Sequence, residues 1–380
     1  MIYYLNSYTN IGHCTEREVS VAANSKIEYI LKTISENFEV INISSAASTG
    51  GYKNRKKVKE GNITYYYLPS LSIRFKMYKT VFKAYCFIFL VSHLKKNDIV
   101  IVYHSLFWVR LMPLLKKFKR FVFLLELNDF YQYHFSGDFA LYIEKIQKEY
   151  FSLPDKFILA NPDMLPQLGY SREYIVNYGA YKVNPVKKKQ EGKIKVIYSG
   201  VAEKLRGAAF LAVKCARYLP DNYELHLACY GTDGNLCELE SEAEEENRFI
   251  NRKVVYFHGT LNEHELDELM SHCDIALSCH GYKPGEEYKA MYSFPSKIPL
   301  NMGAGLYVVS PKLKTFQNTP FDDAMVYFDE FEPESIAKAI MKAGEIVRKS
   351  GQKDRPREIV SDLDRQFRED MKKLLNGRKI

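Results

Sequence analysis

Two cations stand where the sequence predicts the start of a helix. The apolar run at 194–198 has the pattern of a β-strand, and Lys204 and Arg206 lie at the first turn of the helix predicted near 206–218. Cations at a helix N-terminus oppose the helix dipole unless an anion joins them. A bound diphosphate would remove this conflict, with bidentate contacts from Arg206 and a point charge from Lys204. Exposure of both side chains to water is the other interpretation, and this segment alone does not separate the two.

Three further turns have residues suited to binding an anion or a nucleotide. Gly12 follows the first apolar run, where backbone N–H groups could approach an anion, although a tight turn is the simpler explanation. His258 and Gly259 end another predicted strand and would form one wall of a nucleotide pocket. Ser296 and Lys297 follow a proline, as the expected N-cap and first-turn cation of a helix.

Several common catalytic motifs are absent from the sequence. It has no GxxxxGK[ST] loop, no GxGxxG after a strand, no GxSxG and no HExxH. The histidines at 258, 264, 272 and 280 are spaced by six or eight residues, so no two of them share a helical turn. Structural zinc sites usually have closer ligand pairs, and no metal site is therefore predicted.

The elements that must position these residues alternate along the chain. Short apolar runs separated by longer helical patterns indicate βαβ units and parallel sheets covered on both faces. The alternation is interrupted by a basic, polar stretch and then restarts. Two α/β domains are therefore predicted, at 1–183 and 194–360, joined by a linker at 184–193. The last helical pattern, within 361–380, could join either domain.

Composition narrows the class of protein. Of the 380 residues, 46% are hydrophobic and 26% charged, which excludes a disordered or fibrous chain. Residues 50–120 hold 16 Lys and Arg against Glu60 and Asp98, so a polyanion or an anionic membrane is an expected partner of this region. The longest apolar run, at 84–91, is far shorter than the roughly 20 residues of a spanning helix. With no leader-like N-terminus, a cytoplasmic protein is expected.

The order and spacing of the segments from 196 to 310 resemble those of a known protein family. The segments are similar to the C-terminal half of a GT-B glycosyltransferase of family 4, whose GRxxxxKG motif is matched by Gly200 and Arg206. Val201 replaces the first arginine of that motif. In the following PSK pattern the expected glutamates fall on Tyr292 and Leu300.

The resemblance implies an α/β protein of GT-B architecture, with two Rossmann-like domains facing each other across a cleft. It implies an EC 2.4 hexosyltransferase with a UDP-sugar donor on the C-terminal domain, an acceptor on the N-terminal domain, and neither metal nor other cofactor. The diphosphate would contact Gly12, Lys204, Arg206, Ser296 and Lys297, and the nucleotide would contact Gly200, Tyr230, His258, Gly259 and Glu265. Glu286 and Glu287 would bind the sugar, and the catalytic candidates are His104, Glu126, Asp129 and Glu287.

Many proteins that resemble this one build bacterial surface polysaccharides such as capsule on lipid-diphosphate carriers, with retention expected at the sugar. The helix predicted at 71–95 interleaves basic and aromatic residues, as do helices that lie on anionic bilayers. Peripheral attachment to the inner face of the cytoplasmic membrane is therefore expected. Packing of these aromatics in a core is the other interpretation of the helix.

Two other functions stay open. A non-catalytic GT-B relative that binds a nucleotide or a partner is compatible with Val201 and Leu300. A nucleic-acid-binding protein could use the basic region 50–120, but no recognised nucleic-acid-binding motif accompanies it, and no nucleic acid is expected.

Overall fold

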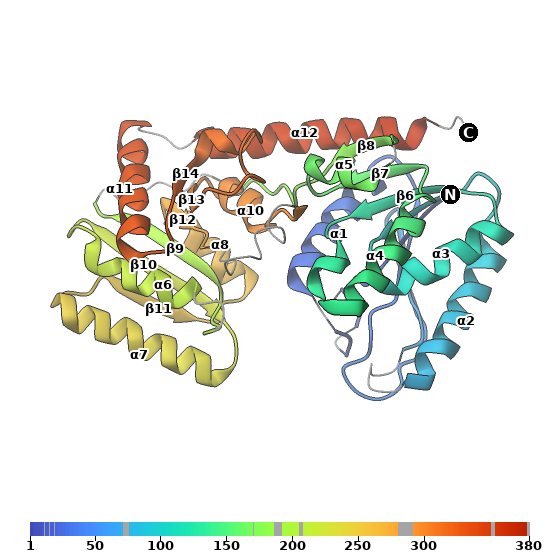
Figure 1. The fold of residues 1–380 in the computed structure, drawn as a ribbon, viewed down its shortest axis with the longest axis horizontal. Helices are drawn as coiled ribbons and strands as arrows, with labels where there is room; N and C mark the ends of the chain where they lie inside the picture. The colour runs from blue at the N-terminus through green and yellow to red at the C-terminus, as the bar shows by residue number, and fades with distance from the viewer. Residues whose placement is uncertain are drawn as a thin grey trace. The chain divides into compact units, whose positions relative to one another are not determined.

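A computed structural model describes residues 1–10, 12–14, 16–18, 20–70, 76–169, 171–185, 192–204, 208–279, 292–350 and 354–377. The chain forms two compact units (Figure 1). Unit one holds Met1–Ala180, Tyr292–Phe294 and the C-terminal segment from Arg365. Unit two holds the chain from Tyr181 to Asp364 apart from Tyr292–Phe294.

Unit one is built on an eight-stranded sheet with the order β3-β4-β2-β1-β5-β6-β7-β8. Its strands are parallel except for the β3–β4 pair. The central strands are short apolar runs because helices cover them, as in other parallel sheets. The elements are β1 (Ile2–Asn6), α1 (Val21–Ser35), β2 (Val40–Ser44), β3 (Lys56–Glu60), β4 (Ile63–Tyr67), α2 (Lys76–His93), β5 (Ile99–Tyr103), α3 (Leu106–Phe118), β6 (Val122–Leu127), α4 (Gly137–Phe151), β7 (Lys156–Leu159), α5 (Leu165–Leu168) and β8 (Glu173–Val176).

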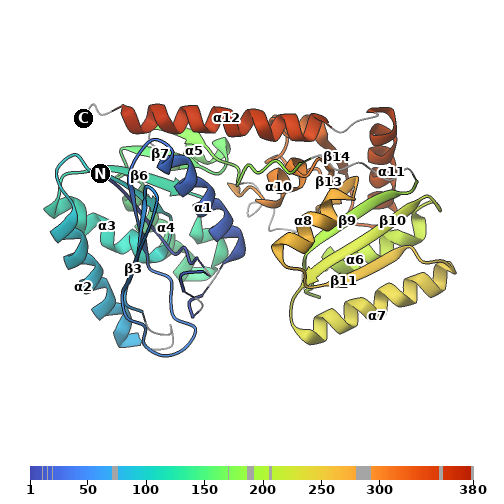
Figure 2. The same ribbon diagram turned by 180° about the vertical axis from the view of Figure 1, so that it is seen from behind.

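The main core of unit one lies under α2, α3 and α4. These helices share one hydrophobic cluster with β1, β5, β6 and β7, in which Trp108 and Phe123 are fully buried. α1 packs outside this cluster and buries Ile27 and Ile30. Figure 2 shows unit one from behind, with α1 beside the sheet.

The strand β3 was not predicted from the sequence. It has a single apolar residue, Val58, between Lys57 and Lys59, so it lacks the alternation of a half-buried strand. It lies at the edge of the sheet and pairs antiparallel with β4. Pairing with β4, and not its own hydrophobicity, therefore makes it a strand.

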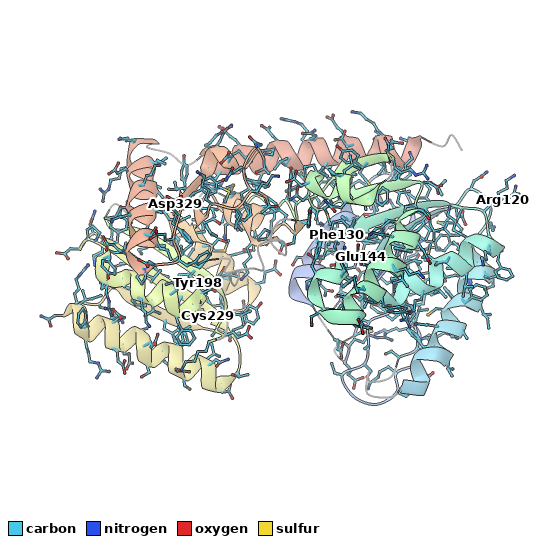
Figure 3. All side chains as sticks on the ribbon, viewed as in Figure 1. Arg120, Phe130, Glu144, Tyr198, Cys229 and Asp329 are labelled. Carbon is cyan, nitrogen blue, oxygen red and sulfur yellow. The ribbon has the colours of Figure 1, made fainter. Side chains whose placement is uncertain are left out.

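Unit two has a six-stranded parallel sheet with the order β11-β10-β9-β12-β13-β14. α6, α7 and α11 share one core with these strands, and Tyr198 and Cys229 are buried in it (Figure 3). The elements are β9 (Ile194–Val201), α6 (Ala208–Cys215), β10 (Tyr223–Tyr230), α7 (Asp233–Ile250), β11 (Val255–Gly259), α8 (Glu263–Ser271), β12 (Ile275–Leu277), α10 (Lys297–Gly303), β13 (Tyr307–Pro311), β14 (Met325–Phe328), α11 (Pro333–Ser350) and α12 (Asp354–Asn376).

The long helix α12 begins in unit two, and its part from Arg365 belongs to unit one. There Phe367 contacts Tyr29 of α1, with ring centroids 5.6 Å apart, and Arg368 pairs with Glu36. At its C-terminal end the buried Lys156 of β7 donates hydrogen bonds to the carbonyl oxygens of Leu374 (2.8 Å) and Gly377 (3.3 Å).

The predicted α/β fold with two parallel, Rossmann-like sheets is confirmed. The prediction of an aromatic membrane face on the helix at 71–95 is wrong for its described part. Phe82 is buried, and Tyr85 and Phe89 pack against the core of unit one, so these rings are structural. α2 instead exposes Val81 and Ile88, and Arg74 lies outside the described residues. Among the helices described, none has the length and apolar character to cross a bilayer.

Candidate functional sites at the carboxyl end of each sheet

In unit two a lysine lies at the carboxyl end of the central strand β9. Lys297 opens α10, and its Nζ donates a hydrogen bond to the carbonyl oxygen of Ser199, 2.6 Å away. Partial burial lowers the pKa of this amine by desolvation. Ligands of open parallel sheets bind outside the carboxyl ends of the strands, so Lys297 stands where an anionic group would arrive.

The predicted partners of Lys297 differ in their surroundings. Gly200 follows Ser199 and is closely packed, because a Cβ there would come within 2.7 Å of the Tyr198 hydroxyl. Lys204 is 70% exposed and pairs with Glu238 of α7, whose contact raises the pKa of the lysine. The predicted diphosphate ligand Arg206 lies outside the described residues.

The next two strands on one side of β9, β10 and then β11, place two predicted nucleotide contacts at the carboxyl edge of the same sheet. Tyr230 ends β10, lies opposite Val201 in register and is half exposed. His258 near the end of β11 is exposed, and its Nε2 lies 3.0 Å from Nδ1 of His226. Partial desolvation of the ring, together with the positive charge of Lys253, lowers the pKa of His258, so its neutral form is favoured. Gly259 then turns the chain with φ of 65°, a conformation that favours glycine.

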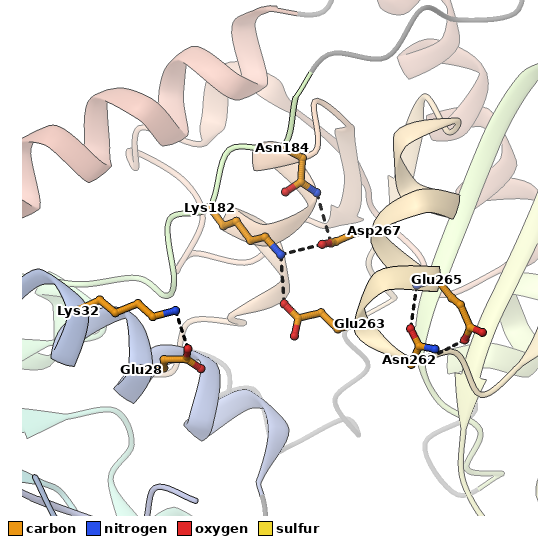
Figure 4. A network of polar contacts seen from close by, with 8 residues as sticks. All are labelled: Glu28, Lys32, Lys182, Asn184, Asn262, Glu263, Glu265 and Asp267. Carbon is orange, nitrogen blue, oxygen red and sulfur yellow. Dashed lines mark hydrogen bonds and ion pairs between the residues drawn. The ribbon is translucent and has the colours of Figure 1, made fainter. Parts of the chain in front are cut away.

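Two predicted roles concern residues at the starts of helices in unit two. Glu265 forms a capping box with Asn262 at the start of α8, which engages its Oε2, so its contact with a nucleotide stays a prediction (Figure 4). Ser296 occupies the N-cap position of α10, but its side chain makes no capping hydrogen bond. Its hydroxyl is therefore not committed to the helix.

The acidic residues predicted for the donor sugar cannot be placed. Glu286 and Glu287 lie outside the described residues. Leu300, where the resemblance predicts a glutamate, is a partly buried residue of α10. Tyr292, at the other expected glutamate position, belongs to unit one.

In unit one a fully buried carboxylate lies at the carboxyl end of β6. Tyr4 donates its hydroxyl proton to Oε2 of Glu126, and Nδ2 of Asn128 donates to Oε1 at 3.1 Å. Burial raises the pKa of this carboxyl, and the positive charge of the nearby Lys26 partly offsets that increase. With no exposed surface and both oxygens bonded, Glu126 cannot act as the predicted general base in this structure.

The lysine beside Glu126 was not singled out in the sequence. Nζ of Lys26 lies 3.9 Å from Oε1 of Glu126 and donates to Oδ1 of Asn128 (2.5 Å) and to the carbonyl of Asn177 (2.8 Å). Burial lowers its pKa to about 8. The sequence did contain a signal for the burial of Lys26. Lys26 lies four residues before Ile30 and therefore on the same, buried face of α1.

His104 follows β5 and is buried among aromatic rings. Its Nδ1 lies 3.1 Å from the carbonyl oxygen of Asp129, which can only accept, so Nδ1 carries the proton. The ring lies 4.7 Å from that of Tyr131, and Nε2 is buried without a partner among the described residues. Desolvation lowers the pKa of His104 to about 3, so the imidazole is neutral.

Asp129 is the predicted acid or base that keeps some exposure to solvent. Its carboxyl is partly buried, which raises its pKa, while His134 and Lys26 act in the opposite direction. It follows β6, at the carboxyl edge of the unit-one sheet where an acceptor is expected. Of Glu126 and Asp129, only Asp129 is accessible to accept a proton from a bound hydroxyl group.

The N–H group of Gly12 is already engaged. It donates to Oδ1 of Asn10 at 2.8 Å, and the carbonyl of Asn10 accepts from the N–H groups of His13 and Cys14. The predicted anion contact by Gly12 would require this turn to open. Among the described residues, no cluster of three His, Cys, Asp or Glu side chains could hold a metal ion.

No family model and no curated protein matches the chain. Solved structures do match over nearly the full length of both chains. An E. coli structure described as trehalose-6-phosphate bound with UDP-2-fluoro glucose has a TM-score of 0.67 and 12% identity, covering 100% of this chain and 99% of that one. Sucrose-phosphate synthase from Thermosynechococcus elongatus has a TM-score of 0.68 and 13% identity, with 98% of each chain covered.

A third match is α,α-trehalose 6-phosphate synthase from Burkholderia multivorans, with a TM-score of 0.65, 11% identity, and coverage of 99% of this chain and 96% of that one. These neighbours are GT-B glycosyltransferases. None of the three is described as a surface-polysaccharide enzyme, so the resemblance to family 4 stays a prediction. The sheets, their order along the chain and these likenesses together show that the protein has the GT-B fold.

Proposed function

We propose that the protein is a metal-independent hexosyltransferase that moves a sugar from a UDP-sugar to a saccharide acceptor. The observation that carries the proposal is the partly buried amine of Lys297 at the carboxyl end of β9, in a protein of GT-B fold. Donor binding by unit two and acceptor binding by unit one follow from the resemblance of the motifs. The neighbour described with UDP-2-fluoro glucose supports a uridine nucleotide.

Glycosyl transfer builds negative charge on the leaving diphosphate. A cation that is already desolvated and fixed can stabilise that charge without reorganising in the transition state. Lys297 fits this role because its amine is held by a carbonyl, which a phosphate oxygen can replace as the hydrogen-bond acceptor. Lys204 can assist by leaving its exposed pair with Glu238, since ion pairs exposed to water contribute little to stability.

On the acceptor side, Asp129 takes the contact with the acceptor hydroxyl. The neutral His104 holds the carbonyl of Asp129, and thereby fixes the chain that presents this carboxyl. The sugar is transferred with retention of its anomeric configuration, as the family resemblance implies. NMR of the product after one turnover tests this point, since an inverted anomeric coupling would contradict it.

The acceptor is a lipid-linked saccharide of surface-polysaccharide synthesis, delivered at the inner face of the membrane. In the described part of α2 and α3, Val81, Ile88, Leu114 and Phe118 are exposed apolar residues. These two helices carry several Lys and Arg residues and no Asp or Glu. Apolar side chains with only positive charges beside them suit a surface of anionic lipid.

The decisive experiment is nucleotide binding by the parent protein and by Lys297→Met. UDP should raise the melting temperature of the parent more than GDP or ADP does. Loss of a charge-assisted contact should weaken UDP binding about 10- to 100-fold in Lys297→Met. Lys314→Met, which removes an exposed lysine elsewhere in unit two, is the control and should keep the parent affinity.

Three results would count against this function. UDP binding that is unchanged in Lys297→Met would remove Lys297 from the donor site. Binding of UDP without transfer from any UDP-hexose to a lipid-diphosphate-linked saccharide would favour the non-catalytic alternative. Binding of no nucleotide would favour a protein that acts through partners alone.

A further inference from the structure

Besides the C-terminal segment from Arg365, three residues in the second half of the chain belong to unit one. Tyr292–Phe294 follow β12 in sequence by fewer than 20 residues and directly precede α10, but both elements belong to unit two. The chain passes from unit one to unit two between Phe294 and Pro295. We refer to Tyr292–Phe294 as the aromatic clip.

The aromatic clip is held by ring contacts inside unit one. Tyr292 stacks on Tyr133, with ring centroids 5.5 Å apart and an interplanar angle of 14°, and meets Phe130 edge-on at 5.4 Å. Phe294 is buried and packs on Tyr178 at 4.6 Å. Each such pair contributes about 0.5–1.5 kcal/mol beyond the area it buries, so three pairs make a stable attachment.

The rings that receive Tyr292 lie in the segment that carries the acceptor-side candidates. Phe130, labelled in Figure 3, comes directly after Asp129 and is buried. The next residue, Tyr131, donates its hydroxyl proton to the carbonyl of His104 at 3.0 Å. Displacing Tyr292 would therefore disturb the packing of a segment whose backbone also fixes His104 and Asp129.

The other end of the aromatic clip leads directly to the donor-side lysine. Lys297 lies three residues after Phe294, and three residues span at most about 10 Å when fully extended. The connection includes Pro295, whose ring restricts the backbone further. The start of α10, and with it the amine of Lys297, is thus tethered to a buried ring of unit one.

We propose that Tyr292 and Phe294 are positioning residues, which link the placement of Lys297 to the packing of residues 128–134. The inference rests on the proposed function, since it takes Lys297 to be a diphosphate ligand. Its consequence is that UDP bound at Lys297 should also steady residues 128–134. At position 292 the resemblance predicts a glutamate that contacts the donor. Here the position instead holds a tyrosine that contacts the aromatic residues of segment 128–134.

Hydrogen exchange with mass spectrometry tests this link in the full-length protein, with UDP as the probe. In the parent, UDP should slow exchange both at 297–303 and at 128–134, the latter by about fivefold or more. In Tyr292→Ala, UDP should still slow exchange at 297–303 but lose its effect at 128–134. Phe139→Ala, which removes an exposed ring that meets Phe135 edge-on, is the control and should behave as the parent.

A second comparison needs no ligand. Without UDP, Tyr292→Ala should speed exchange at 297–303 relative to the parent, because the start of α10 loses its tether, whereas Phe139→Ala should not. If Tyr292→Ala does not fold, Tyr292→Leu keeps bulk, removes the stacking and should give the same pattern in weaker form.

The outcomes distinguish a failure of the proposed link through Tyr292 from a failure of the proposed function. If UDP binds the parent but does not affect 128–134, or affects it equally in Tyr292→Ala, the link is rejected while the proposed function stands. If UDP fails to bind the parent, the proposed function fails, and unchanged exchange at 297–303 in ligand-free Tyr292→Ala would reject the tether as well.

Discussion

Lys26 and Glu126 place two ionisable groups where little water reaches them. Each is buried and hydrogen-bonded, but the 3.9 Å between Nζ and Oε1 is longer than a hydrogen bond. Desolvation lowers the pKa of Lys26 and raises that of Glu126, so burial outweighs the attraction between them in both cases. Such pairs fix geometry more than they stabilise a fold.

The pKa of Lys26 predicts how stability depends on pH. Its pKa is about 8 in the folded protein and about 10.4 in the unfolded chain, so the unfolded chain binds more protons between these values. The contribution of Lys26 to the free energy of unfolding should therefore rise by up to about 3 kcal/mol from pH 8 to pH 10.5. Below pH 8 that stability is absent, because the buried amine is charged.

Urea unfolding of the parent and Lys26→Met at pH 7, 8, 9 and 10 measures this effect. The difference in free energy of unfolding, parent minus variant, should be flat from pH 7 to 8 and then rise. Parallel pH profiles for the two proteins would show that Lys26 titrates normally in the fold.

Gly303 at the end of α10 allows a close approach of the chain. A Cβ at this position would come within 1.9 Å of the carbonyl oxygen of Lys182, and Asn184 donates its N–H to the carbonyl of Gly303 at 2.9 Å. Gly303→Ala should therefore destabilise unit two by about 1–3 kcal/mol, because backbone must shift. Gly234→Ala, where a Cβ has no neighbour within 4 Å, should cause no loss. Denaturant unfolding measures the stability of both variants. Equal stability of Gly303→Ala and Gly234→Ala would contradict the conclusion that the close approach of the chain requires glycine at 303.

The C-terminal end of the helix α12 is held by hydrogen bonds from a side chain of the strand β7. The last carbonyl groups of a helix have no partners within it, and Lys156 supplies two hydrogen bonds there. It also pairs with Glu173 of β8 at 2.9 Å. The final turns of α12 are thus attached to unit one by a buried cation.

Lys156→Met should release the end of α12. The variant should lose about 1–3 kcal/mol in the free energy of unfolding of unit one, because the buried carbonyl group of Leu374 loses its donor. Amide exchange at 366–377 should become faster, and Lys372→Met, which alters an exposed lysine of the same helix, should leave it unchanged. Exchange at 366–377 as slow as in the parent would mean that Tyr29 and Glu36 suffice to hold the helix.

The elements also show how far the sequence predicts the fold. The apolar runs at 2–6 and 194–198 predict central strands correctly, since burial on both faces leaves a clear pattern. β3 could not be found, because its pairing with β4 is not visible in KKVKE. The aromatics of α2 were misassigned, since a ring spacing of three and four fits a core as well as a membrane.

At the scale of the whole molecule, the candidate site was less predictable than the fold. The pattern around Lys297 identified a cation at a strand end, because proline, serine and lysine occur together at a helix start. The burial of Glu126 and its partner Lys26 depends on elements far apart in sequence. Likewise, no local pattern reveals that Tyr292 packs with Phe130 and Tyr133.

The distribution of charge predicts how the protein meets a membrane. Lys76, Lys79 and Lys83 lie on α2, and each basic residue near an anionic surface contributes about 1 kcal/mol. Reversing all three to Glu should weaken binding to phosphatidylserine vesicles by about 100-fold or more. The same net change on α11, Lys338, Lys342 and Lys349 to Glu, is the control and should have a much smaller effect. Vesicle co-sedimentation measures both, and equal effects would indicate attraction by net charge alone.

Three lysines of the 50–120 region lie at the edge of a sheet, where positive charge has an effect that requires no lipid. Lys56, Lys57 and Lys59 lie on β3, at the open edge of the unit-one sheet, and all three are exposed. An edge strand offers unpaired N–H and C=O groups to any other strand, and lysines there repel a second copy of the same edge. Replacing the lysines of β3 by neutral residues should therefore lower solubility before it affects activity. Without the repulsion between lysines, the open edge of the sheet could pair with the same edge of another molecule.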